Sequence, residues 1–375
     1  MQIAPLSPRR SATLLTLSML VVLIGALRPF PAAAAGKPRP VRVETRNLYL
    51  GADLAPALEA SNPFELAAAA STIWQQVVAT DFPARAQALA VEIDDASPLL
   101  VGLQEVALWR TGPPDGPPAF GGAPATDVAF DFLTLLLDAL AERGLTYDAV
   151  VVQQEADLEA PTLIGFDVRL TMRDVILAKA VGSGELTLTN PQSANYTSNL
   201  TLPIAGGLTS VTSTRGWTSI DVTAKHRQFR FVNTHLEAFS NFYRTAQAFE
   251  LLSGPVTTTS LPVVLVGDLN SAPDDPVFSE PGSPLNNTNP YDILTASGFV
   301  DTWALLHPQD PGVTCCNEPD LLNPIPTLFQ RIDHVMLRAG GTAYRSKVIG
   351  VDPANRTGDG LWPSDHAGVT AALAP

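Results

Sequence analysis

The sequence of 375 residues has little charge, almost no cysteine and no long uninterrupted segment. Only 16% of its residues are charged whereas 46% are apolar, and this balance excludes intrinsic disorder as the main state. Its 33 prolines and 26 glycines interrupt every long segment, which excludes a coiled coil. Lys and Arg number 23 against 37 Asp and Glu, so the net charge of −14 argues against a basic module that binds nucleic acid. The length suits one large domain or two ordinary ones.

Long apolar runs are also missing, with one exception near the N-terminus. The uncharged stretch Ser11–Leu27 follows the positive pair Arg9–Arg10 and leads to the small residues Ala32–Ala35. This order is typical of a cleaved export signal, and the apolar stretch is short for a membrane span, which needs ~20 residues. We therefore expect residues 1–35 to be a signal peptide removed near Ala35, and the protein to be secreted or periplasmic. An uncleaved anchor is the alternative.

The two cysteines, Cys315 and Cys316, are neighbours in the sequence. An exported chain with two cysteines usually contains a disulfide, but a bridge between neighbours closes a strained ring. Free thiols and a bridge both remain open, and we favour the bridge because the expected compartment is oxidising. Two thiols without other soft ligands nearby do not predict a metal site.

Short runs separated by turns predict many strands and a few helices. Alternation at period two predicts a half-buried strand over residues 41–45. Mostly apolar runs predict buried strands over residues 99–103, 149–152, 175–178, 229–232 and 263–266. Amphipathic spacing predicts helices over residues 84–96, 127–143 and 243–252. Composition predicts loops over residues 111–126 and 271–292. The Thr- and Ser-rich segment 181–218 predicts hairpins or a segment that leaves the main sheets. Strands distributed along the whole chain favour one α/β domain over residues 36–375.

Polar side chains that can carry chemistry follow several of these strands. They are Glu105, His235, Asp268, Asn270, Asp333, Asp365 and His366. A carboxylate or imidazole after a strand lies at the rim of a sheet, where a pocket can form. Each residue alone is a weak signal, because an acid after a strand is commonly a turn residue. Together they supply the oxygen ligands, imidazoles and amide needed for metal-assisted hydrolysis of a phosphate ester.

The order of these residues resembles that of the endonuclease/exonuclease/phosphatase superfamily. The motifs are Gln104-Glu105, Asn233-Thr-His235, Gly267-Asp-Leu-Asn270, Arg331-Ile-Asp333 and Ser364-Asp-His366, preceded by Arg46-Asn47 after the first strand. The resemblance covers about residues 41–374. This superfamily includes deoxyribonucleases, apurinic endonucleases, inositol-polyphosphate phosphatases and secreted neutral sphingomyelinases. The resemblance implies a four-layered α/β sandwich, in which two mostly antiparallel sheets pack together and helices flank them.

The resemblance also implies a metal site and a general base. Glu105 resembles the family's Mg²⁺ carboxylate, with Mn²⁺ as an alternative ion, and Asn47 and Asp365 would lie beside the ion. His366 resembles the general base that takes a proton from the attacking water, a task that suits an imidazole near neutral pH. Asp333 matches the acid that orients this imidazole. A buried ion pair with the neighbouring Arg331 is the plainer interpretation of Asp333.

The remaining implied roles concern the phosphate. His235 resembles a second imidazole that stabilises the phosphoryl oxygens or protonates the leaving group. Asp268 and Asn270 match the pair that positions the nucleophile and the reacting phosphorus. Arg173 and Arg215 are candidate phosphate contacts, although a salt bridge explains Arg173 equally well.

The substrate class is less sharply indicated than the chemistry. Loss of the leader would leave 20 Lys and Arg against 37 Asp and Glu, a net charge of −17 that disfavours long-range capture of DNA. Trp362, and the Pro- and Gly-rich loop with Trp109 and Phe120, are candidates for peripheral membrane contact, with a plain solvated loop as the alternative. Export and only four lysines argue against an inositol-phosphate phosphatase. We expect a monomeric phosphodiesterase without an obligate protein partner, acting on a phospholipid head group or on nucleic acid. A non-catalytic binding or toxin-type subunit on the same scaffold is the alternative, and the intact catalytic set speaks against it.

Overall fold

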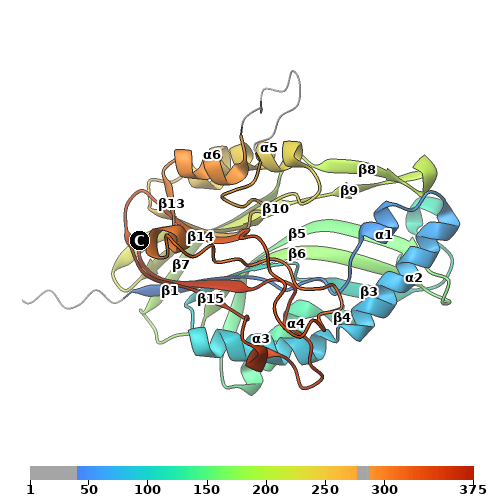
Figure 1. Cartoon of the computed structure of the whole chain (residues 1–375), viewed down its shortest axis with the longest axis horizontal. Helices are drawn as coiled ribbons and strands as arrows, with labels where there is room; N and C mark the ends of the chain where they lie inside the picture. The colour runs from blue at the N-terminus through green and yellow to red at the C-terminus, as the bar shows by residue number, and fades with distance from the viewer. Residues whose placement is uncertain (1–39, 277–284, 286–287) are drawn as a thin grey trace, which may run out of the picture. The chain divides into compact units, whose positions relative to one another are not determined.

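Two β-sheets pack face to face in the computed structural model, which describes residues 40–276, 285 and 288–375 (Figure 1). The eight-stranded sheet contains, in spatial order, β15 (Thr342–Ile349), β16 (Gly368–Ala374), β1 (Val41–Asn47), β2 (Leu100–Gln104), β6 (Asp167–Lys179), β3 (Leu108–Gly112) and β4 (Asp127–Asp131), with β5 (Tyr147–Pro161) paired to β6. The six-stranded sheet runs β13 (Phe299–Asp301), β14 (Asp333–Arg338), β12 (Val263–Asp268), β11 (Arg227–His235), β10 (Gly216–Ala224) and β7 (Leu186–Asn195). A separate hairpin joins β8 (Leu200–Ile204) to β9 (Thr209–Ser213). The pairs β1–β2 and β11–β12 are parallel, and the other pairs in these sheets are antiparallel.

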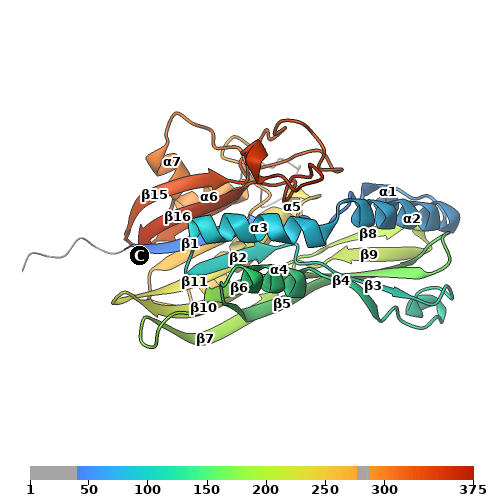
Figure 2. The same cartoon turned by 90° about the horizontal axis from the view of Figure 1, so that it is seen from below.

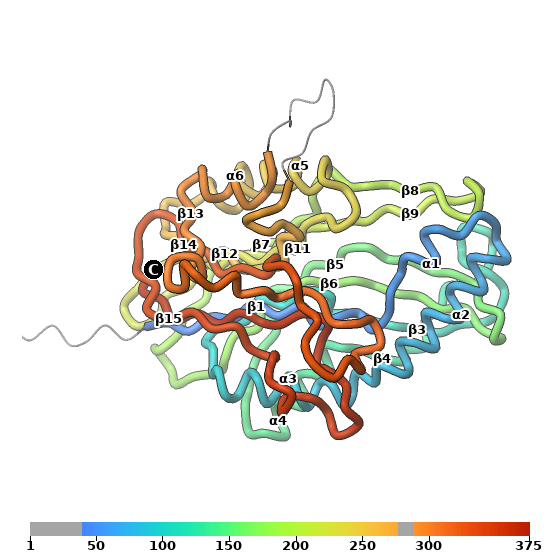
Figure 3. The backbone as a smooth tube through the Cα atoms, in the orientation of Figure 1, coloured from blue at the N-terminus to red at the C-terminus, as the bar shows by residue number. Residues whose placement is uncertain are grey.

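Helices cover the outer face of each sheet. The eight-stranded sheet is covered by α2 (Pro63–Ala79), α3 (Phe82–Ala96) and α4 (Phe132–Glu142), with the short α1 (Ala55–Leu58) beside α2 (Figure 2). The six-stranded sheet is covered by α5 (Asn241–Leu251) and α6 (Pro290–Ala296), while α7 (Thr302–Leu306) lies beside β15 (Figure 3). The described residues from 40 onward form one compact unit, and the predicted leader, residues 1–35, lies outside the described residues. The four-layered α/β sandwich is therefore confirmed.

Apolar side chains fill the three spaces between the four layers. Val43, Ile176, Phe231 and Val264 are buried between the two sheets. The outer layers bury residues such as Phe132 from α4, whose ring stacks on Phe82 of α3, and the core under α5 and α6 is equally apolar. Because both faces of β2 and β12 are buried, these two central strands are mostly apolar rather than alternating.

Three secondary-structure predictions need correction. Residues 127–131 form the edge strand β4 and not the start of a helix, because the Asp131 side chain accepts a hydrogen bond from the Leu133 N–H, 3.1 Å away, and caps α4 at Phe132. The sequence reasoning missed α2, although Asn62 caps it and Pro63 stands in its first turn. The predicted loop 111–126 includes the end of β3 and a short 3₁₀ turn at Pro118–Phe120.

One buried carboxyl group lies in the core away from the chemistry. Glu44 in β1 is fully buried, and its two carboxylate oxygens have no hydrogen-bond partner among the described residues. Burial raises the pKa of Glu44 from 4.5 to about 8; the charge of Glu92 adds to this shift and Arg46 opposes it. The folded chain therefore holds this proton more tightly than the unfolded chain, so the stability that it contributes is full below about pH 4.5 and is lost as the pH rises towards 8.

We expect Glu44→Gln to stabilise the chain at pH 8 by roughly 1–3 kcal/mol and to have little effect at pH 5. The neutral amide removes the cost of a buried charge that the wild type carries only at the higher pH. Urea unfolding of both proteins at the two pH values, in EDTA, measures the difference. Equal destabilisation of the variant at both pH values would contradict the assignment of a titrating Glu44.

Candidate active site

The topology brings the ends of several strands to one edge of the two sheets. β1 and β2 run parallel with Asn47 opposite Gln104, so Glu105 follows directly at that edge. β11 and β12 also run parallel, with His235 opposite Asp268. β14 runs antiparallel to β12, so its first residue, Asp333, stands opposite Asp268. Residues that are far apart in the sequence therefore meet where these strands stop.

Two polar residues of the motifs join the sheets to each other rather than point to a substrate. Gln104 Nε2 of the first sheet donates to Asn233 Oδ1 of the second at 2.6 Å, and Asn233 Nδ2 donates to the Leu103 carbonyl at 3.1 Å. The sheets approach so closely here that a Cβ at Gly102 would collide with Asn233 and Val266. These contacts fix the spacing between Glu105 on one sheet and the groups on the other.

The end of β12 and the loop after it have a fixed backbone shape. Gly267 has a φ of 150°, and a side chain there would collide with the carbonyl of Thr234 on β11. Asp268 Oδ1 accepts a hydrogen bond from the Asn270 N–H at 2.8 Å, and Asn270 Nδ2 donates to the Leu236 carbonyl at 2.9 Å. Asn270 takes a φ of 46°, in the left-handed region that asparagine tolerates better than most residues. The loop thereby holds Asp268 in one orientation beside the imidazoles.

His366 forms a buried acid–imidazole pair with Asp333. His366 Nδ1 lies 2.8 Å from Asp333 Oδ2, and its Nε2 lies 3.8 Å from Asp268 Oδ2. Arg331 pairs with Asp301 instead of Asp333, which leaves Asp333 to the imidazole. Burial by itself would lower the pKa of His366, but the carboxylates of Asp333, Asp365 and Asp268 outweigh it and raise the pKa well above its ordinary value. Nδ1 donates to the acid, so the neutral ring presents the lone pair of Nε2.

The backbone and surroundings of His366 are also fixed. The buried guanidinium of Arg46 donates to the His366 carbonyl and forms an ion pair with Glu92 at 3.0 Å. Cys315 and Cys316 form a disulfide, and Cys316 Sγ lies 3.9 Å from His366 Nε2. The structure thus contains the bridge that the sequence favoured, and places it against the candidate base.

Asp268 lies between the two imidazoles. Its Oδ2 is 3.1 Å from Asn47 Nδ2 and 3.4 Å from His235 Nε2. Burial, together with the charge of Asp333, raises the pKa of Asp268 to about 7, although His366 opposes the shift. A carboxyl group in this state can accept or return a proton near neutral pH.

The side chain next to Nδ1 of His235 is a cation, whereas the one next to Nδ1 of His366 is an acid. Arg215 Nη1 lies 2.9 Å from His235 Nδ1. A guanidinium has only donors, so Nδ1 must accept and the ring proton must be on Nε2. Burial lowers the pKa of His235 well below its ordinary value, and the charges of Arg215 and His366 lower it further. His235 is therefore a neutral donor through Nε2. The two imidazoles are held in opposite tautomers, because neutral His366 has a lone pair on Nε2 and His235 has a proton there.

We expect Arg215→Gln to lower kcat by ~10²-fold, in the range seen when one donor to a developing negative charge is lost. The variant removes the group that fixes the His235 tautomer and keeps the ring neutral, so the pKa of His235 should rise. Histidine ¹⁵N chemical shifts, measured across pH, report both the tautomer and the titration. Arg215→Lys, which retains the positive charge, should keep His235 neutral. An unchanged His235 signal in Arg215→Gln would contradict the assignment.

Two buried acids beside Arg215 were not assigned to the site from the sequence. Glu155 of β5 and Asp174 of β6 are buried, and their carboxylate oxygens have no hydrogen-bond partner in the described part of the chain. Arg215 Nη1 lies 3.9 Å from Glu155. Burial raises the pKa of Glu155 to about 8 against the pull of Arg215, and burial with the charge of Glu155 raises that of Asp174. Asp174 directly precedes a predicted strand, which was an available signal, whereas no motif marked Glu155.

Two further acids, Glu105 and Asp365, fit a divalent cation. Glu105 and Asp365 are half-buried; Glu105 Oε2 accepts from the Leu50 N–H at 2.8 Å, and Asp365 Oδ1 accepts from Ser364 Oγ at 3.3 Å. Burial raises the pKa of Asp365 to about 6; His366 opposes this shift and Glu105 adds to it, so the two acids repel each other in the absence of a cation. Hard carboxylate oxygens in excess of nearby positive charge are the donors that Mg²⁺ and Mn²⁺ bind. Glu105 and Asp365 would hold such an ion.

Two predicted site residues, Asn47 and Arg173, are held by protein groups. Asn47 donates to Asp268 and accepts from the Tyr49 N–H at 2.8 Å, so both ends of its amide are in use. Arg173 donates to the Val106 carbonyl at 2.9 Å and pairs with Asp131 at 2.6 Å, which is the salt-bridge alternative for this residue. Among the described residues, three groups of His, Cys, Asp or Glu side chains are tight enough to share one ion. They are Asp268–Asp333–His366, Glu155–Asp174–His235 and Cys315–Cys316–His366, and neither Glu105 nor Asp365 belongs to any of them.

Comparisons with known proteins agree with this geometry. A model of the endonuclease/exonuclease/phosphatase family matches residues 189–366. A family protein from Bacteroides thetaiotaomicron has a TM-score of 0.53 at 15% identity, covering 90% of this chain and 98% of that chain. A family protein from Beutenbergia cavernae has a TM-score of 0.53 at 18% identity, covering 90% of this chain and 72% of that chain. A mannosyl-6-phosphatase of B. thetaiotaomicron has a TM-score of 0.51 at 16% identity, covering 89% of this chain and 100% of that chain.

No curated protein matches the sequence at a significant level, and the solved structures, at these low identities, show the fold alone. The family match spans the segment that carries His235, Asp268, Asn270, Asp333 and His366. Fold, motif order and family match agree. The chain therefore has the fold of the endonuclease/exonuclease/phosphatase superfamily, and residues 189–366 match the model of that family.

Proposed function

We propose that the protein is a secreted, divalent-metal-dependent phosphodiesterase. The observation that carries this proposal is the pair of imidazoles in opposite states on either side of Asp268, His366 held by Asp333 and His235 held by Arg215. A base and a neutral donor that face one space are the groups needed for attack of water on a phosphoryl centre. A scaffold that only binds has no need for this arrangement.

The roles of the side chains follow from their protons. His366 Nε2 takes a proton from the attacking water, and Asp333 stabilises the imidazolium that forms. The Nε2–H of His235 donates to a phosphoryl oxygen as negative charge develops there. Asp268 Oδ2 lies 3.4 Å from His235 Nε2 and 3.8 Å from His366 Nε2, and it can accept and return a proton in the space between them. A divalent ion at Glu105 and Asp365 would supply charge neutralisation at the phosphate.

Secretion is part of the proposal and is supported by the N-terminal sequence, with its positive start, apolar stretch and small residues before Gly36. Among the described residues, no helix has both the length and the apolar content to cross a membrane. Expression of the full chain in a bacterium with an N-terminal sequence determination of the product tests the cleavage near Ala35. An intact N-terminus in the cell fraction would contradict export.

The proposed activity is tested by acid release in a pH-stat with purified residues 36–375. Plasmid DNA and phospholipid vesicles are supplied separately, each with Mg²⁺, with Mn²⁺ and with EDTA. We expect metal-dependent release on one of the two substrates, which decides between nucleic acid and phospholipid. Release that persists in EDTA would contradict the metal requirement. Silence on both substrates and on simple aryl phosphodiesters would favour a binding subunit.

A further inference from the structure

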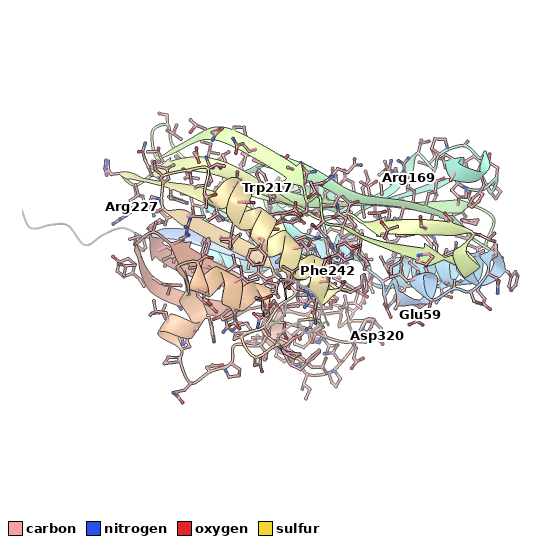
Figure 4. All side chains as sticks on the ribbon, turned by 90° about the horizontal axis from the view of Figure 1, so that it is seen from above. Glu59, Arg169, Trp217, Arg227, Phe242 and Asp320 are labelled. Atoms are coloured by element: carbon pink, nitrogen blue, oxygen red, sulfur yellow. A yellow bond between two sulfur atoms is a disulfide. The ribbon has the colours of Figure 1, made fainter. Side chains whose placement is uncertain are left out.

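An apolar cavity lies at one end of the molecule, where α1, α2 and the β8–β9 hairpin form part of its wall. Its volume is about 650 Å³, within the usual range of small-molecule sites. Its lining includes Leu58, Leu66, Ile73, Trp109, Ile204 and Val211. Strands β3, β5 and β6 pass beneath the helices at this end, as Figure 1 shows, and Figure 4 places Arg169 and Glu59 at the same end. No step of the proposed reaction uses this cavity.

The charged residues of the cavity wall are paired with one another. Arg169 Nη2 lies 2.6 Å from Asp157 Oδ2, and its Nε lies 3.8 Å from Glu159. At the rim, Phe120 and Leu208 expose 64% and 66% of their surface, so they extend the apolar surface of the cavity outward. A nucleobase or sugar would need unpaired polar groups to recognise it, so the wall favours a hydrocarbon.

The cavity is connected to the candidate metal carboxylate through a single residue. Trp109, in the cavity wall, donates from Nε1 to the Leu50 carbonyl at 2.8 Å. The N–H of Leu50 donates to Glu105 Oε2 at 2.8 Å. One residue, Leu50, therefore touches both the wall of the cavity and the acid that would hold the metal, which places the cavity close to the candidate metal site.

We propose that this cavity binds a hydrocarbon chain of the phosphodiester substrate. The inference rests on the proposed phosphodiesterase activity and names the substrate class as one with an alkyl or acyl chain. Each methylene group that enters the cavity leaves water, which raises kcat/KM by about fourfold per group until the cavity is full.

The test is a series of 4-nitrophenyl alkyl phosphate diesters from ethyl to dodecyl, used below their aggregation concentrations. We expect kcat/KM to rise steeply with chain length and then level off. Ala57→Trp, which fills the cavity from α1, should flatten the series while the ethyl diester is hydrolysed as before. Leu208→Asp at the rim should reduce the slope, whereas Leu305→Asp, at an exposed leucine outside the cavity, is the matched control and should not.

The outcomes separate this inference from the activity on which it rests. Hydrolysis at one rate for all chain lengths would refute the hydrocarbon site and leave the phosphodiesterase intact. Hydrolysis of none of them would count against the proposed function. Calorimetric binding of dodecyl phosphate to the wild type, lost in Ala57→Trp, would still support the cavity as a hydrocarbon site, and absence of binding would refute it.

Discussion

His366→Ala is expected to lower kcat for phosphodiester hydrolysis by about 10²–10⁴-fold, the range that a positioned general base contributes. His366 Nε2 carries a lone pair that faces the space beside Asp268, 3.8 Å from Asp268 Oδ2. The other ring nitrogen, Nδ1, is held by Asp333 at 2.8 Å. Alanine leaves no acceptor for the proton of the attacking water. KM should change little, because the other side chains that face the phosphate remain. Steady-state kinetics on the substrate found in the pH-stat measures both constants.

His226→Asn is the matched control for this variant. His226 is exposed in the turn after β10 and has a φ of 65°, which asparagine adopts readily. Its activity and unfolding temperature should equal those of the wild type. A His366→Ala protein that is folded by circular dichroism and retains wild-type kcat would remove His366 from the mechanism.

The strands and the site motifs were predictable because their signals are local. A buried strand such as β12 is a continuous apolar run, and the acid that ends it stands at the rim of the sheet. The helix α2 also had a local signal, an Asn62 cap before Pro63, and was missed because its alanine-rich sequence has no obvious apolar stripe. Asp131 shows the opposite error, since one capping side chain moved the start of α4 by five residues relative to the predicted start at residue 127.

The partners within the site could not be predicted from sequence, because each contact joins segments far apart in the chain. The alternation of Arg331 and Asp333 left open whether they pair, and the structure gives Arg331 to Asp301 instead. Arg215 could be named as a phosphate contact but not as the partner of His235, because strand register decides which side chain faces Nδ1. Arg173, a second candidate phosphate contact, likewise pairs with Asp131, a partner that the sequence did not indicate.

Asp333→Asn is expected to be nearly as damaging at neutral pH as loss of His366 itself. The asparagine amide can donate to His366 Nδ1, which moves the ring proton to Nε2 and leaves no lone pair for the water. The same exchange in an acid–imidazole–nucleophile triad lowers kcat by ~10⁴-fold with the geometry intact. Asp333 is fully buried and contacts the ring directly, so a comparable loss is expected here.

The pH dependence distinguishes this electrostatic role from a merely structural one. The charge of Asp333 helps raise the pKa of His366, so wild-type activity should increase as the pH rises through that raised pKa and the ring becomes neutral. Without the charge the pKa of His366 falls, and the acidic limb of the residual activity should move to lower pH.

The stability of the folded chain depends on the same pKa. Because the pKa of His366 is raised, the His366–Asp333 pair stabilises the folded chain below about pH 6.5, and this contribution is lost as the pH rises through the raised pKa. Asp333→Asn should remove that part of the pH dependence of unfolding. A variant with low activity but the wild-type acidic limb would show that Asp333 holds the fold and does not tune the base.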